Sequence, residues 1–157
     1  MSTPSAAPAS EAAPSTEKID LASVGPVIVG ADHGGFELKQ AVVAHLEAQG
    51  VEFEDIGTHS TDSVDYPDFA HRVANGVASG EFPFGILCCT SGVGMSIAAN
   101  RHPGVQAAIA LDTDDAVLIR EHNNTNVLCL SGRKTSHEEA LNIIDTWLTT
   151  PFAGGRH

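Results

Sequence analysis

The sequence has few positively charged side chains. Only 8 of its 157 residues are lysine or arginine, against 20 aspartates and glutamates, which gives a formal net charge of −12 at pH 7. A surface this acidic repels nucleic-acid phosphates and anionic lipid headgroups, so we expect no nucleic-acid or membrane partner. Because cations are scarce, the few arginines become the natural candidates to hold an anionic small molecule.

Long apolar runs and a cysteine framework are also missing. Although 42% of the residues are hydrophobic, no segment approaches the roughly 20 apolar residues needed to span a bilayer. The cysteines, Cys88, Cys89 and Cys129, form neither a CxxC pair nor a spaced Cys/His metal cluster. We therefore expect free thiols, no metal, and the reducing environment of the cytoplasm.

The N-terminal segment lacks the composition of a folded core. Residues 1–24 are rich in Ala, Pro, Ser and Thr, and they cannot bury enough apolar area to offset the entropy of ordering. They have neither the basic start and apolar run of a secretory signal nor the arginines of a mitochondrial presequence. The sequence predicts a disordered extension over residues 1–24 and one domain over residues 25–157.

From residue 26 onward, short apolar runs alternate with longer amphipathic stretches. This pattern predicts strands that alternate with helices, hence βαβ units and a parallel sheet covered on both faces. The order of the strands does not follow from the sequence. The predicted strands are 27–30, 51–56, 84–89, 105–111 and 127–131, and the predicted helices are 36–49, 67–78, 94–100, 113–121 and 136–149.

Polar and glycine-rich segments follow several of the predicted strands. Asp32 and His33 come directly after the first strand. Cys89 closes the third strand, Asp112 follows the fourth, and Arg133 follows the fifth. Because ligands of open α/β sheets bind outside the carboxyl ends of the strands, we expect these residues to meet at one edge.

The segment that begins at Cys89 combines a thiol with a glycine turn before a predicted helix. The first N–H groups of a helix are unpaired, so Ser91, Gly92, Val93 and Gly94 can receive an anion or a developing oxyanion. The same partial positive charge is expected to lower the pKa of the Cys89 thiol. The segment fits no dinucleotide fingerprint, P-loop, nucleophile elbow or Cys-x5-Arg phosphatase loop, because it lacks a residue that each of these motifs requires.

Cys88 and Cys89 are neighbours at the end of the third predicted strand. Successive strand residues face opposite ways, so at most one of the two thiols meets the site. We assign that role to Cys89, next to the glycine turn, and place Cys88 in the core. The alternative, that both are ordinary small residues of a buried strand, stays open on these grounds.

Two polar clusters each have a functional and a structural interpretation. Asp32 and His33 suit hydrogen bonds to sugar hydroxyls and phosphate, but a helix cap by Asp32 with a surface His33 is equally compatible. His122 and Asn123 suit the opening of a cyclic sugar, with His122 as general acid/base. A helix C-terminus explains the same pair.

Two single residues are also candidates. Tyr66, the only tyrosine, lies either in a pocket wall or in a packed turn. Arg156 is one of the few cations and lies near the C-terminus, where a flexible end is the default expectation.

Together these segments resemble the ribose-5-phosphate isomerase B family, which also includes the galactose-6-phosphate isomerase subunits. The resemblance runs from about residue 26 to residue 157. It implies a three-layer α/β/α Rossmann-like fold with a five-stranded parallel sheet, and a homodimer with active sites at the subunit interface. It also implies a sugar-phosphate substrate and no metal or organic cofactor. The matching segments are 30–36, 65–67, 89–100, 122–127 and 154–157.

The resemblance implies a role for each candidate residue. Cys89 would be the base that moves a proton between C1 and C2 of the sugar through an enediolate. The backbone of residues 91–94 would stabilise the charge of that intermediate, and His122 would open the furanose ring. The hydroxyls would be arranged by Asp32, Tyr66 and Asn123, and the phosphate held by His33, Arg133 and Arg156, some of them across the interface.

The chain departs from the family pattern at several positions. Ser91 stands where the family usually has threonine, and Thr90 replaces a usual glycine, which we expect to narrow the turn. Met95 occupies the position where a second subclass has a glutamate base, so the cysteine subclass applies. Many relatives continue past the position of His157 to another phosphate-binding arginine, so we expect weaker phosphate binding or a shortened chain.

Two other functions stay open. An isomerase of a hexose 6-phosphate, such as allose or galactose 6-phosphate, would use the same chemistry in a longer pocket, and the sequence does not show pocket length. A non-catalytic sugar-phosphate-binding module would need neither Cys89 nor His122, and both are present.

Overall fold

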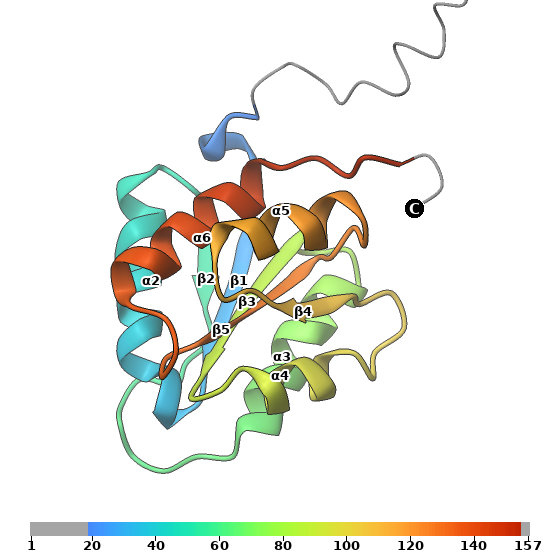
Figure 1. The fold of residues 1–157 in the computed structure, drawn as a ribbon. Helices are drawn as coiled ribbons and strands as arrows, with labels where there is room; N and C mark the ends of the chain where they lie inside the picture. The colour runs from blue at the N-terminus through green and yellow to red at the C-terminus, as the bar shows by residue number, and fades with distance from the viewer. Residues whose placement is uncertain (1–18, 155–157) are drawn as a thin grey trace, which may run out of the picture.

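The computed structural model describes residues 19–154. In this range a five-stranded parallel sheet lies between two layers of helices (Figure 1). The strand order is β2-β1-β3-β5-β4, so β2 and β4 are the edge strands. The predicted three-layer α/β/α fold with a five-stranded parallel sheet is confirmed. The strands are β1 (Val27–Ala31), β2 (Phe53–Asp55), β3 (Phe84–Cys89), β4 (Ala107–Ile109) and β5 (Val127–Ser131).

Two of the five α-helices in the described range begin at a side chain that caps a free N–H group. The Asp112 carboxylate accepts the N–H of Asp115 at 2.7 Å, and the Ser136 hydroxyl accepts the N–H of Glu139 at 3.1 Å. Within residues 19–154 the helices are α2 (Phe36–Ala48), α3 (Tyr66–Ala78), α4 (Val93–Ala99), α5 (Thr113–Glu121) and α6 (His137–Thr149), with 3-10 turns η1 (Leu21–Ser23) and η2 (His33–Gly35).

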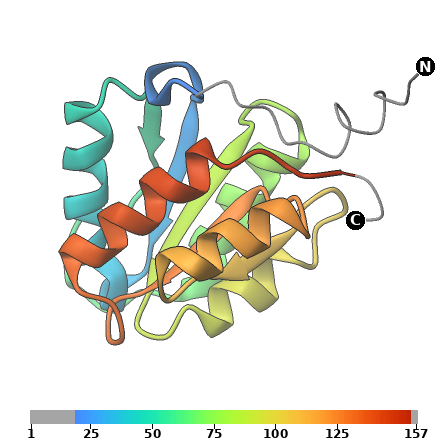
Figure 2. The ribbon, with the colours of Figure 1, turned by 45° about the horizontal axis from the view of Figure 1, so that its top comes forward.

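The helices divide between the two faces of the sheet. One face is covered by α2, α5 and α6, and α5 and α6 run side by side (Figure 2). The other face is covered by α3 and α4. Trp147 is fully buried on the first face and Met95 on the second. Cys88 belongs to the first core and Cys89 to the second, as expected for adjacent residues of a strand.

Two strands are shorter than the sequence predicts. The predicted strand 51–56 becomes β2, and the predicted strand 105–111 becomes β4. Val51 donates its N–H to the carbonyl of Leu46 at 2.9 Å, so it closes the end of α2 instead of joining the sheet. Both shortened strands are edge strands, which pair with a neighbour on one side only.

The N-terminal extension is shorter than the sequence predicts. Disorder is predicted through residue 24, whereas Leu21–Ser23 form η1 and Val24 packs in the core. The Asp20 carboxylate fixes this turn by accepting the N–H of Ala22 at 3.1 Å. Ordered chain therefore begins before the predicted boundary. Residues 1–18 lie outside the described range, and their disorder stays a prediction.

Candidate active site

Three loops meet at the carboxyl ends of the central strands. Asp32, after β1, donates its N–H to the carbonyl of Cys88 at 3.3 Å. Gly132, after β5, donates to the carbonyl of Cys89 at 2.8 Å, and Arg133 donates its N–H to the carbonyl of Thr90 at 3.1 Å. The backbone thus ties the loops after β1 and β5 to the loop after β3. The prediction that the residues after the strands meet at one edge is confirmed for Asp32, Cys89 and Arg133.

The turn after β3 wraps backbone donors around the Cys89 thiol. Gly92 has φ +85°, a left-handed conformation that favours glycine, and its N–H donates to Cys89 Sγ at 3.0 Å. The thiol side chain is buried, with 5% of the residue exposed. The backbone of Ser91 and Met95 also donates to it.

Burial raises the pKa of the Cys89 thiol above its ordinary value. The N–H group of Gly92 lowers that pKa, and the nearby Asp32 carboxylate raises it. The predicted net lowering is therefore wrong, because loss of hydration opposes the thiolate more strongly than the turn stabilises it. A thiolate formed here, with its raised pKa, would be a correspondingly strong base.

The other two thiols lie in the core. Cys88 and Cys129 have no exposed surface, and burial is the main cause that raises the pKa of each. Neutral buried thiols of this kind are inert, so the placement of Cys88 in the core is confirmed.

The loop after β1 fixes Asp32 and His33. Asp32 Oδ1 accepts the N–H of Gly35 at 3.0 Å, so the structural interpretation of Asp32 as a helix cap holds. The His33 ring accepts the N–H of Val64 on its Nδ1 atom at 3.1 Å. A neutral His33 therefore carries its proton on Nε2, which leaves an N–H donor on an exposed side chain.

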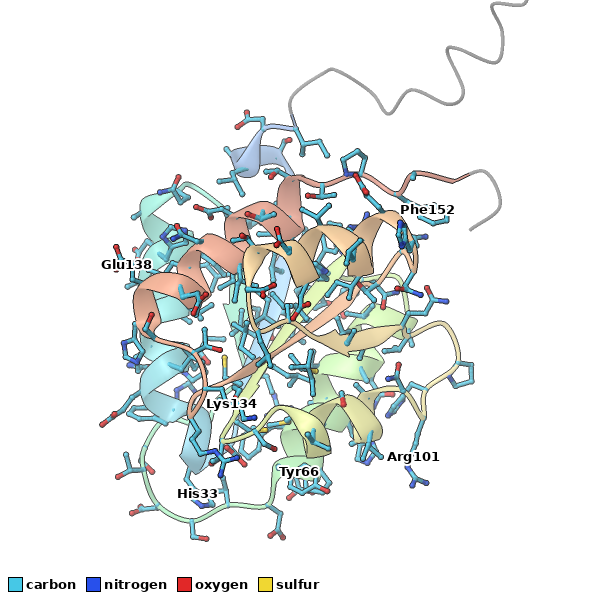
Figure 3. All side chains as sticks on the ribbon, viewed as in Figure 1. His33, Tyr66, Arg101, Lys134, Glu138 and Phe152 are labelled. Carbon is cyan, nitrogen blue, oxygen red and sulfur yellow. The ribbon has the colours of Figure 1, made fainter. Side chains whose placement is uncertain are left out.

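Tyr66 packs directly on the glycine turn after β3. A Cβ atom at Gly94 would lie 2.7 Å from Cζ of the Tyr66 ring, so only glycine admits this contact. Tyr66 is 40% exposed, and its place in a pocket wall stays a prediction. Figure 3 shows His33 and Tyr66 at the same end of the molecule.

Two cations follow β5 at this end. Arg133 is exposed and follows β5, at the edge of the sheet where the sequence predicts it. Lys134 is exposed too, and Figure 3 shows it at the same end as His33. Sequence reasoning missed Lys134, although its position directly after Arg133 was the available signal. Ser91 lies in the turn itself, where its hydroxyl accepts the N–H of Val93 at 3.2 Å.

His122 and Asn123 lie at the opposite end of the sheet. His122 caps the C-terminus of α5 and precedes β5, whereas Cys89 pairs with Ser131 at the far end of that strand. The four steps from Val127 to Ser131 span about 13 Å. The fold of one chain therefore does not bring His122 and Asn123 to Cys89, and the helix-terminus interpretation of His122 is confirmed.

The loop that carries His122 is firmly anchored. The Arg120 guanidinium, 8% exposed, donates to the carbonyl of Thr125 at 2.6 Å and to the Asn124 side chain at 3.0 Å. Trp147 donates its indole N–H to the Thr125 hydroxyl at 3.0 Å. Asn124 has φ +50°, which asparagine tolerates better than most residues. The positions of His122 and Asn123 are thus set by buried contacts.

Two cavities of about 300 and 370 Å³ lie away from the glycine turn after β3. The larger one is lined at the edge strand by Asn100, Gln106, Ala107, Ala108, Asn123 and Thr125. Between residues 19 and 154, no three His, Cys, Asp or Glu side chains are grouped as metal ligands would be. No helix in this range is long and apolar enough to cross a membrane. Arg156 lies outside the described residues.

Comparison with known proteins identifies the family. The ribose/galactose isomerase family model matches residues 27–157. Ribose-5-phosphate isomerase B of Escherichia coli (strain K12) is 47% identical over 131 residues, which cover 83% of this chain and 88% of that protein.

Solved structures agree in both sequence and fold. A ribose 5-phosphate isomerase of Thermotoga maritima is 51% identical with a TM-score of 0.83, covering 85% of this chain and 92% of that one. Ribose-5-phosphate isomerase B of Mycoplasma genitalium with bound ribulose-5-phosphate is 40% identical with a TM-score of 0.81, covering 84% and 88%. With similarity over nearly the whole domain, this chain belongs to the ribose/galactose isomerase family.

Proposed function

We propose that this protein is an aldose–ketose isomerase that interconverts ribose 5-phosphate and ribulose 5-phosphate. The observation that carries the proposal is the Cys89 thiol, which lies 3.0 Å from the N–H of Gly92 in a glycine turn. Proton transfer next to a carbonyl needs a base and fixed donors for the developing oxyanion. This turn holds both, and relatives named as ribose-5-phosphate isomerase B support the choice of substrate.

The reaction is a proton transfer in two steps. The Cys89 thiolate removes the proton on C2 of the open aldose, and the electron pair forms the C1–C2 double bond of an enediolate with its charge on O1. A proton then moves from the C2 hydroxyl to O1, which shifts the charge to O2. Backbone N–H groups of residues 91–94 stabilise this oxyanion. The thiol then returns the proton to C1, which gives the ketose and restores the thiolate. No electrons leave the sugar, so the step needs no redox cofactor.

The remaining groups come from a second copy of the chain. His122 and Asn123 lie at the amino end of β5, and a two-fold symmetric pairing of two chains would bring those of each chain to the Cys89 of its partner. Two apolar side chains support such a contact: Val93 and Ile97 are 49% and 54% exposed, one turn apart on α4. We infer a homodimer with an active site at each end of its interface, in which His122 opens the sugar ring.

The other candidate residues bind the substrate. His33 and Arg133 hold the phosphate from loops that the backbone ties together, and Arg156 adds a further cation. Asp32, Tyr66 and Asn123 orient the hydroxyls. Charge-assisted bonds from two or three cations suit a phosphate dianion on an otherwise acidic protein.

This activity places the protein in the non-oxidative pentose phosphate pathway of carbohydrate metabolism. The free thiols at positions 88, 89 and 129 agree with a cytoplasmic location.

The test is conversion of ribose 5-phosphate to ribulose 5-phosphate in the presence of EDTA, with allose 6-phosphate in parallel. We expect turnover of the pentose that EDTA does not affect. Cys89→Ala should lower kcat about 10²–10⁴-fold while ribose 5-phosphate still binds, because a positioned base contributes about that factor. Cys88→Ala, one residue away on the opposite face of the sheet, is the matched control and should keep most of the activity.

Turnover of the hexose alone would keep the chemistry and replace the substrate. Full activity in Cys89→Ala would remove the thiol from the mechanism. Binding of both sugar phosphates without turnover by the unaltered protein would point to a binding module instead.

A further inference from the structure

Thr90 lies where the three loops of the site meet. Its carbonyl accepts the Ser131 hydroxyl at 2.7 Å and the N–H of Arg133 at 3.1 Å. Both partners belong to the end of β5, while Thr90 itself follows β3. The backbone of Thr90 is therefore held from two sides, directly beside one of the cations assigned to the phosphate.

The Thr90 side chain rests on the loop that carries the other phosphate-binding group. A Cβ atom at Gly34 would lie 2.2 Å from Thr90 Oγ1, so the absent side chain at position 34 makes room for the hydroxyl. Gly34 directly follows His33. The hydroxyl of Thr90 thus lies against the His33 loop, while the carbonyl of the same residue binds the Arg133 loop.

The Thr90 hydroxyl is available to a ligand. Thr90 is exposed, and among the hydrogen bonds of residues 19–154 none is donated by its hydroxyl. A β-branched side chain has few χ1 choices, and a fixed backbone makes the position of Oγ1 better defined. A pre-positioned donor binds with little loss of side-chain entropy.

We propose that the Thr90 hydroxyl donates a hydrogen bond to the substrate's phosphate, between His33 and Arg133. The inference rests on the proposed function, whose phosphate it binds. A bond to a charged phosphate oxygen is stronger than one between neutral groups. Asp32 Oδ1 lies 3.4 Å from the same Cβ position at Gly34, so a carboxylate lies near the Thr90 hydroxyl and would repel a phosphate bound there. A neutral donor at Thr90 offsets that repulsion in a site with few cations.

The test compares Thr90→Val, which keeps the shape without the hydroxyl, with Thr90→Ser, which keeps the hydroxyl. Binding of inorganic phosphate is measured by titration calorimetry, and kcat and KM for ribose 5-phosphate are measured separately. We expect Thr90→Val to weaken phosphate binding and to raise KM by about tenfold each, with kcat within about twofold. Thr90→Ser should stay within about twofold of the unaltered protein in both, and equal melting temperatures would show that each variant folds.

The outcomes separate this inference from the proposed function. If Thr90→Val binds phosphate as well as the unaltered protein does, the hydroxyl is not a ligand and the inference fails, whatever the isomerase assay shows. An equal loss in Thr90→Ser would assign the effect to shape and would also overturn it. A selective loss of phosphate affinity in Thr90→Val, in a protein that turns over no pentose, would support the phosphate contact and refute the proposed function.

Discussion

The two ends of the sheet are built differently. At the carboxyl end, backbone groups tie the loops together, as Gly132 does with the carbonyl of Cys89 at 2.8 Å. At the amino end, side-chain bonds add to backbone bonds such as that from the N–H of Asn126 to the carbonyl of Gln106: the Asn126 amide donates to the carbonyl of Gly104 at 2.9 Å and accepts the N–H of Gln106 at 2.9 Å. One end presents a thiol and the other His122. A parallel sheet separates residues that follow strands from residues that precede them, so chemistry that uses both needs two chains.

The most direct test of this difference between the two ends is to inactivate them in separate chains. Cys89→Ala and His122→Ala should each lose activity at least about 100-fold when alone. Mixed after dissociation and reassociation, they should recover activity, because a mixed dimer holds one site with both groups intact. Random pairing makes about half of the dimers mixed, with one good site each, so about one quarter of the normal activity should return.

The control uses two defects at the same end. Cys89→Ala mixed with Asp32→Asn leaves every site with one defect, since both residues come from the carboxyl end of one chain. No recovery is expected from this pair. If both mixtures recover equally, or if neither does, then His122 does not act across an interface.

Much of the fold follows from local patterns in the sequence. The bounds of β3, α5 and β5 agree with the predicted ones because apolar runs and helix caps are local signals. The strand order is not local: β5 lies between β3 and β4, although β4 precedes β5 in the chain. The edge strands were predicted too long, since apolar residues beyond the paired segment look the same in sequence.

The sequence identifies the candidate residues of the site one by one, but it does not show how they are arranged in space. Asp32, Cys89 and Arg133 follow strands, so the rule for parallel sheets places them together. His122 precedes a strand, and the same rule applied to it would have placed it at the other end. The direction in which the pKa of Cys89 shifts depends on how deeply the thiol is buried, and the spacing of residues in the sequence does not show that depth.

Arg120 should be the largest single contributor to stability at the amino end. It is buried, lies over the Phe84 ring at 5.3 Å, and donates to the carbonyls of Thr125 and Thr150 at 2.6 and 3.0 Å. Arg120→Ala leaves these acceptors without a donor, so we expect a loss of about 3 kcal/mol in the free energy of unfolding, measured by urea denaturation.

The matched control is Arg101→Ala, since Arg101 is exposed and follows α4 at the same end of the sheet. A surface substitution of this kind should change the free energy of unfolding by less than about 0.5 kcal/mol. Equal effects of the two substitutions would show that the loop before β5 does not depend on the guanidinium.

A smaller loss of stability is expected when one glycine at either end of the sheet is replaced by alanine. Gly92 has φ +85° in the turn after β3, and Gly104 has φ +87° in the turn between α4 and β4. A Cβ at Gly92 would meet Ile109 at an ordinary 3.4 Å, and one at Gly104 would meet nothing within 4 Å. Alanine at either position therefore costs only the left-handed backbone, about 1 kcal/mol in the free energy of unfolding.

Activity should distinguish the two glycine variants where stability does not. The N–H of Gly92 bonds to Cys89 Sγ, so a shift of this turn in Gly92→Ala moves an oxyanion donor, and kcat should fall at least about tenfold. Gly104→Ala changes a turn far from the thiol in its own chain, and kcat should stay within about twofold. If kcat falls equally in both, the turn after β3 has no special place in catalysis, because equal backbone strain at either end would account for the loss.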